Sequence, residues 1–107
     1  MAFDAFDITL QLIRSLVPVL DVLTHRDPDL ARQLRRAAAS IALNLQEGRC
    51  RSGRDRTHHY RIAHGSAEET MACLKVAQAF GHIGSDATAA AHALGDRVQA
   101  MLWRLTH

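Results

Sequence analysis

The chain has 107 residues, of which 13 are basic and 11 acidic, so its net charge is only +2. Hydrophobic residues make up 48% and charged residues 22%, which is typical of one globular domain and excludes a disordered or strongly basic tail. Two cysteines are too few for a disulfide framework, so we expect a reduced, cytoplasmic protein. Asp4, Asp7 and Arg14 interrupt the apolar start, which therefore resembles neither a signal peptide nor a membrane span.

The first expected helix covers about residues 4–24, and its apolar surface is unusually wide. An ordinary surface helix has an apolar arc of roughly 100° or slightly more, which the other helices of its own bundle can cover. The apolar surface of this helix is too wide to be buried completely in one bundle. Because exposed apolar patches mark interfaces, we expect part of this helix to contact another protein chain. Pro18 removes a backbone hydrogen bond and is expected to kink the helix near Arg14. Two apolar sets run along this helix: Ala5, Ile8, Leu12, Leu16, Val19 and Leu23 on one side, and Phe6, Leu10, Ile13, Val17 and Leu20 on the other.

The second expected helix follows Asp27, whose carboxylate can accept hydrogen bonds from the free N–H groups of the first turn. Pro28 suits the first helical position because its missing N–H has no partner there. We expect this helix to end at Glu47, with Gly48 as a left-handed terminator.

The third expected helix begins near Ser52 or Asp55, which have the spacing of a capping box, and ends at Phe80 before Gly81. The fourth runs from about Ser85 to the C-terminus. Connections of roughly four to seven residues predict antiparallel neighbours. We therefore expect an all-α fold, an up-down-up-down four-helix bundle that forms one domain over residues 1–107.

A polar stripe is expected to face the hairpin formed by the second and third helices. A turn near Arg51 places Ser40 opposite Gly65 and Ser66, and places Arg36 opposite Glu69. One interpretation is a partly buried Arg36–Glu69 ion pair that fixes the register. The other is a solvated face with no special role. Gly65 is expected to permit a close approach of the two backbones. The polar cluster comprises Arg36, Ser40, Asn44, Glu47, Ser66 and Glu69, with Asn44 and Glu47 expected to tie the hairpin together.

Two sequence blocks, RQLRRAAASIALNLQEG at 32–48 and RIAHGSAEE at 61–69, carry a resemblance to a known family. They resemble the bacterial four-helix-bundle family named after the protein encoded in intervening sequences of 23S rRNA genes. The resemblance implies a ring-shaped homo-oligomer, a pentamer. It also implies kinship with accessory proteins of diversity-generating retroelements, which bind nucleic acid and a reverse transcriptase. Ala42 stands where the family often has proline. For most members no biochemical activity is known.

The small net charge hides a strong asymmetry along the sequence. Residues 32–61 hold eight arginines against two acidic residues, a balance of +6, while the remainder holds five basic and nine acidic residues, a balance of −4. Arginine suits planar phosphate contacts, so this segment is a candidate nucleic-acid interface. It could equally contact the acidic first helix of a neighbouring subunit or stay solvated. Aromatic residues are only 5%, which argues against base-stacking platforms. The candidate nucleic-acid-binding residues are Arg35, Arg49, Arg51, Arg54, Arg56 and Arg61.

No motif for catalysis or metal binding is evident in the sequence. His64 and Glu68 could supply two metal ligands, but no third is indicated. Cys50 lies between two arginines that could activate it, yet no catalytic base accompanies it, and Cys73 is expected to be a small core residue. We therefore expect no metal, no cofactor and no enzymatic activity. The main prediction is an oligomeric interaction or scaffold protein with no membrane partner. The alternative is an accessory protein that binds RNA or DNA, with nucleic acid or a nucleic-acid enzyme as partner.

Overall fold

The computed structural model describes residues 2–107, with side chains from residue 4 onward. It contains four helices: α1 (Ala2–Arg26), α2 (Pro28–Arg49), α3 (Gly53–Ala79) and α4 (Ser85–Thr106). These bounds confirm the predicted all-α fold and differ from the expected ones by a few residues. No strand occurs within the described residues.

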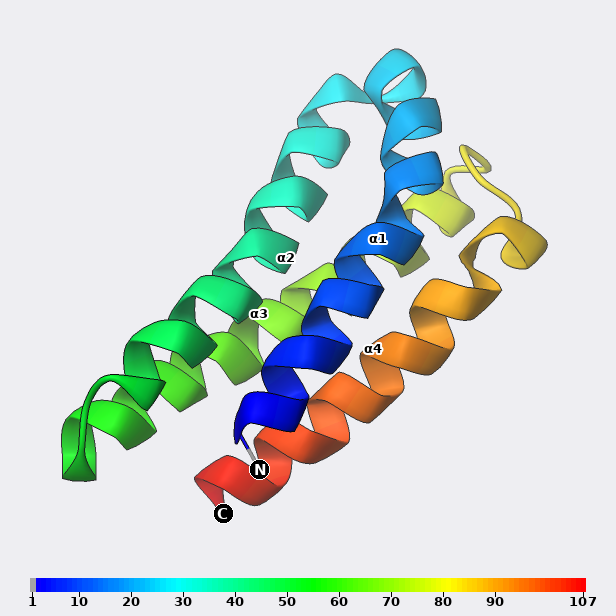
Figure 1. Cartoon of the computed structure of the whole chain (residues 1–107). Coiled ribbons are helices and arrows are strands. Elements are labelled where there is room, and N and C mark those ends of the chain that lie inside the picture. Colours follow the sequence, from blue (N-terminus) through cyan, green and yellow to red (C-terminus); the bar gives the residue numbers. More distant parts are fainter. Residues whose placement is uncertain (1) are drawn as a thin grey trace.

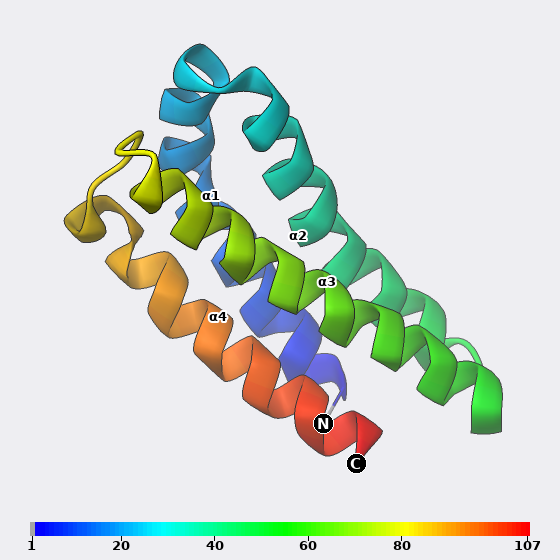
Figure 2. The ribbon, with the colours of Figure 1, turned by 180° about the vertical axis from the view of Figure 1, so that it is seen from behind.

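The four helices pack in a closed square in which each one contacts two neighbours. The contacting pairs are α1 with α2, α2 with α3, α3 with α4, and α4 with α1. Figures 1 and 2 show that consecutive helices run antiparallel. The molecule is elongated, with principal extents of 43 × 22 × 19 Å. In both views the turn between α2 and α3 projects beyond the chain ends of α1 and α4.

The two apolar sets of α1 have different environments. The first set is buried in the core between the other helices: Ala5, Ile8, Leu12, Leu16, Val19 and Leu23. In the second set, Phe6, Ile13 and Leu20 are only partly buried, and Val17 is 51% exposed. The expectation that one bundle cannot cover the whole apolar arc is thus confirmed.

Pro18 lies inside α1, which continues without interruption from Ala2 to Arg26. Both views show the axis of α1 changing direction in its second half. This bend agrees with the backbone hydrogen bond that a proline removes from the helix.

The ends of α2 and α3 match the predictions in part. The carboxylate of Asp27 accepts from the backbone N–H of Leu30 at 3.1 Å, as expected of an N-cap. The other oxygen of Asp27 lies 3.2 Å from Nε2 of His82, and Arg26 donates to the His82 carbonyl at 2.8 Å. The predicted capping box at Ser52 is wrong, because the Ser52 side chain makes no capping hydrogen bond. The predicted end of α3 before Gly81 is confirmed, and Gly81 has a positive φ of 75°.

The structural roles of two glycines differ from those predicted. Gly48 lies inside α2 and does not terminate it. A Cβ at Gly48 would lie 2.5 Å from a ring carbon of Tyr60 and 3.2 Å from the carbonyl oxygen of Arg56, so its missing side chain lets α3 approach α2 closely. Gly65, which was expected to have that role, is exposed and a Cβ there would meet nothing within 4 Å.

Candidate functional site

A chain of hydrogen bonds joins α2 to α3 across the middle of the hairpin. The hydroxyl of Ser66 donates to the hydroxyl of Ser40 at 2.8 Å, which confirms the predicted register. The Asn44 amide donates to the Ser40 carbonyl at 3.0 Å and to its hydroxyl at 3.1 Å. Because the NH₂ group of Asn44 is engaged in this way, its oxygen accepts from Nδ1 of His59 at 3.1 Å. All four side chains are half-buried, so these directional contacts define how the two helices align.

A polar groove of about 490 Å³ lies beside this chain of hydrogen bonds. Arg36 lines it from α2 and Glu69 from α3, yet within the described residues neither forms an ion pair or hydrogen bond with the other. The structure thus contradicts the interpretation of a partly buried Arg36–Glu69 ion pair and agrees with the alternative of a solvated face. Both side chains are exposed, and a solvated pair gains too little to hold two long side chains together. The groove is lined by Asp29, Arg32, Gln33, Arg36, Ala37, Ser40, Ser66 and Glu69.

Glu47, the other acidic residue of the expected cluster, bonds to the turn residue Arg51 rather than to α3. Its carboxylate accepts from Arg51 at 2.8 Å. This hydrogen bond and the positive charge of Arg51 lower the pKa of Glu47, and the same bond and the negative charge of Glu47 raise the pKa of Arg51. The expectation that Glu47 ties α2 to α3 is thus wrong, whereas Asn44 does make such a contact.

Two of the candidate arginines contribute to the structure of the turn. Arg51 is occupied by Glu47. Arg56 donates through Nε to the Gly48 carbonyl at 3.1 Å and through a terminal nitrogen to the Arg49 carbonyl at 3.3 Å. These carbonyls belong to the last turn of α2, where intrahelical donors are absent. Arg56 therefore caps α2 and has fewer donors free for a ligand.

Two other candidate arginines share one face of α3 at the projecting end of the hairpin. Arg54 and Arg61 line a hollow of about 860 Å³ together with Asp55, Thr57 and His58. Both arginines are exposed, and no hydrogen bond or ion pair to either is found in the described part of the chain. Arg35 does not join them, because it lies on the opposite side of the hairpin, between α1 and α2. The structure therefore brings together only part of the predicted arginine patch.

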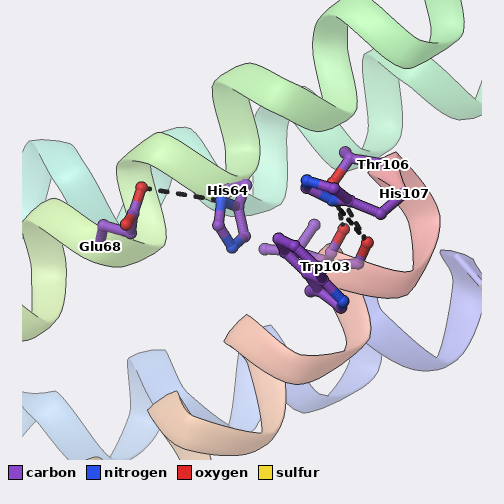
Figure 3. Close-up of polar contacts among 6 residues, drawn as sticks. His64, Glu68, Trp103, Thr106 and His107 are labelled. Carbon is purple, nitrogen blue, oxygen red and sulfur yellow. Dashed lines mark hydrogen bonds and ion pairs between the residues drawn. The ribbon is translucent and has the colours of Figure 1, made fainter.

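An exposed aromatic pair on α4 lies near this end of α3. Trp103 is 53% exposed and stacks on His107, with ring centroids 3.3 Å apart and an interplanar angle of 20°. Figure 3 shows the rings of His64 on α3 and Trp103 on α4 pointing toward each other. Nδ1 of His64 lies 3.7 Å from the Glu68 carboxylate. No sequence motif marks Trp103, although its place next to the inward-facing Leu102 indicates an outward position.

An apolar surface lies on the opposite side of the hairpin, between α1 and α2. A groove of about 180 Å³ is found there, and Leu43 one turn further along α2 is 69% exposed. Its lining is almost wholly apolar apart from one arginine: Ile13, Leu16, Val17, Leu20, Arg35, Ala38 and Ala39. Apolar residues exposed together on two adjacent helices are typical of a contact surface.

The described residues include two thiols and offer little for covalent or metal chemistry. Both cysteines are free; Cys50 is exposed and Cys73 is buried. Burial, assisted by the negative charge of Glu69, raises the pKa of the Cys73 thiol, so Cys73 stays protonated. Among the residues that the structure describes, no three His, Cys, Asp or Glu side chains converge as a metal site would require. In the same part of the chain, no helix is long and apolar enough to cross a membrane.

Comparison with known proteins gives one family and one fold. The family model of the 23S rRNA-intervening sequence protein matches residues 3–104. The crystal structure of a protein of unknown function from the S23 ribosomal protein family of Bacteroides thetaiotaomicron has a TM-score of 0.84 to this chain. The two are 19% identical, and the match covers 95% of this chain and 97% of the other. No curated protein matches the sequence.

Proposed function

The chain belongs to the 23S rRNA-intervening sequence protein family, and from this premise and the uncovered apolar face between α1 and α2 we propose that it is a non-enzymatic protein that self-associates and acts through protein contacts. The observation that carries the proposal is the exposure of Val17 and Leu43 beside an apolar groove. Covering such a surface removes apolar area from water, which favours association. The free cysteines suit the reducing cytoplasm.

The occupant of this face is a second copy of the chain, arranged head to tail. Residues 32–61 carry a balance of +6 and the rest of the chain −4, so unlike regions of two copies attract each other. A head-to-tail contact that closes gives a ring. The family resemblance favours a homopentamer, with a mass of five times 11.8 kDa, about 59 kDa.

Light scattering after size exclusion tests self-association directly. The native chain should elute as a multimer, and changing both Val17 and Leu43 to Asp should give a folded monomer of 11.8 kDa. Val76→Asp is the matched control, because Val76 is an apolar residue of α3 that is 42% exposed on another face. A native monomer at micromolar concentration would overturn the proposal, as would a Val76→Asp variant that dissociates like the double variant.

A second candidate function is nucleic-acid binding by the projecting end of the hairpin. It is favoured by Arg54 and Arg61, whose guanidinium groups line one hollow and have no partner in the described chain. Unpaired guanidinium groups suit phosphates, and a ring would repeat the same contacts in every subunit. This function is compatible with self-association, because the hollow and the apolar face are lined by different residues.

The salt dependence of binding tests this second function. Anisotropy of a labelled oligonucleotide should show affinity falling steeply with salt, as phosphate contacts require. Replacing Arg54 and Arg61 by Gln should reduce the slope of log K against log salt by about 1.4, since each contact to a single strand contributes about 0.7. The control variant replaces Arg14 and Arg97 by Gln, which removes the same charge from exposed positions on α1 and α4. If the slope fell equally in both double variants, binding would depend on the net charge of the protein and not on the positions of Arg54 and Arg61.

A further inference from the structure

Trp103 is the one tryptophan of the chain, and it is placed unusually for a large aromatic residue. Its neighbour Leu102 is fully buried, whereas Trp103 is 53% exposed. His107 covers the indole by stacking at 3.3 Å, and it is held by hydrogen-bond contacts of its Nδ1 to the Trp103 carbonyl at 3.1 Å and to the Thr106 hydroxyl at 3.0 Å. About half of the residue's surface therefore stays accessible, backed by a second ring (Figure 3). The low aromatic content argues against an extended stacking platform, but a single backed, exposed ring can accept another flat group by stacking.

The antiparallel register of α3 and α4 places Trp103 beside the arginine hollow. Nε2 of His92 lies 2.8 Å from Oε1 of Gln78, and a Cβ at Gly95 would touch the Met71 side chain. Continued toward the chain end, this register brings Trp103 level with His64, in agreement with Figure 3. The indole thus lies at one end of the α3 face that carries the arginines.

The distance along this face matches a short run of nucleotides. Arg61 precedes His64 by three residues in α3, and Arg54 precedes it by ten. His58 lies between the two arginines and lines the same hollow. At about 1.5 Å per residue, the face extends about 15 Å from the level of Trp103 to Arg54. A stacked strand rises about 3.4 Å along its axis per nucleotide, so about four nucleotides span this length.

We propose that the projecting end of α3 binds single-stranded nucleic acid, with one base stacked on the indole of Trp103 and the adjoining phosphates contacted by Arg61 and Arg54. This inference rests on the second function proposed above and adds the form of the ligand and a stacking residue. Inside a duplex each base is already stacked on both sides, so an indole could stack on one only after unstacking it. In a single strand the base face is free, and every base has one, so binding tolerates different sequences.

The single tryptophan provides a direct readout. A twelve-nucleotide oligothymidylate, titrated into the full-length protein with excitation at 295 nm, should quench the emission of Trp103 as a base covers the indole. N-acetyltryptophanamide corrects for absorption by the oligonucleotide. A blunt duplex of the same length should bind more weakly at equal salt and leave the emission nearly unchanged.

Substitution measures the contribution of the ring to affinity. Trp103→Leu should weaken oligothymidylate binding roughly tenfold in anisotropy. Phe80→Leu is the matched control, because Phe80 is also exposed, at 69%, and also stacks on a histidine, His82, but at the opposite end of α3. The control should bind like the native chain. Circular dichroism confirms that both variants are folded.

The outcomes separate this inference from the function on which it rests. If neither oligonucleotide binds, the nucleic-acid function itself is wrong. If oligothymidylate binds with strong salt dependence but without quenching, and Trp103→Leu binds like the native chain, the nucleic-acid function stands and the stacking role is overturned. Equal affinity for the duplex would overturn the assignment to single strands.

Discussion

The two sides of α2 are built on different principles. Toward α3, directional contacts supplement the apolar packing: the Ser40–Ser66 and Asn44–His59 hydrogen bonds and the close approach at Gly48. Toward α1, the contact is apolar and incompletely covered, and Val17 remains half exposed. Directional contacts allow one alignment of two helices, whereas apolar burial is non-directional and leaves surface for another chain. One helix thus defines the register on one side and offers a partner surface on the other.

The largest effect is expected in the core of α1. Leu16 is fully buried, and Leu16→Ala should lower the free energy of unfolding by about 2–5 kcal/mol, measured by urea denaturation. Val17→Ala, at the adjacent exposed position, should change it by no more than about 0.5 kcal/mol in the monomer. If both variants lost the same stability, the distinction between the two apolar sets of α1 would disappear.

The two glycines of the hairpin give the next largest effect, and with opposite signs. Gly48→Ala inserts a methyl group against the ring of Tyr60 and should destabilise by about 1–3 kcal/mol. Gly65→Ala adds a methyl group in open space on a helix and should stabilise by about 0.5–1 kcal/mol. Thermal denaturation followed by circular dichroism compares them. A stabilising Gly48→Ala would contradict the close approach of α2 and α3.

Ser40→Ala tests the hydrogen-bond chain. It removes the hydroxyl that accepts from both Ser66 and Asn44, and it should cost about 1 kcal/mol. A double-mutant cycle with Ser66→Ala isolates the contact between the two hydroxyls. If the two losses in free energy of unfolding were simply additive, this hydrogen bond would contribute no coupling energy between α2 and α3.

The smallest effect concerns the turn. Because Arg51 lowers the pKa of Glu47 in the folded chain, this pair stabilises the fold at pH above the ordinary carboxyl pKa of about 4.3. The stabilisation is lost as the pH falls through the lowered pKa. Glu47→Gln should therefore reduce the melting temperature slightly at pH 7, and the difference from the native chain should vanish in strong acid. A difference that grew on acidification would contradict the sign of this linkage.

Local sequence signals predicted the helices and the hairpin register well. Asp27 and Pro28 marked a helix start, and the spacing of three and four residues placed Ser40 opposite Ser66. The failures at Arg36 and at the two hairpin glycines have a common physical reason, since they depend on how far two helix faces stand apart. That distance decides whether Arg36 reaches Glu69 and which glycine lies at a close contact. It is a property of packing across helices, which periodicity along one helix does not contain.

The contacts of His82 make the two ends of the bundle unequal. His82 and Arg26 link the α3–α4 connection to the junction of α1 and α2, so both connections at that end are fastened to each other. The opposite end has a single turn that projects past its neighbours. Local opening therefore costs less free energy at the projecting turn, and amide hydrogens there should exchange with solvent sooner than those near His82. The chain is thus stiff where its two connections meet and most adaptable in the segment that carries its arginines.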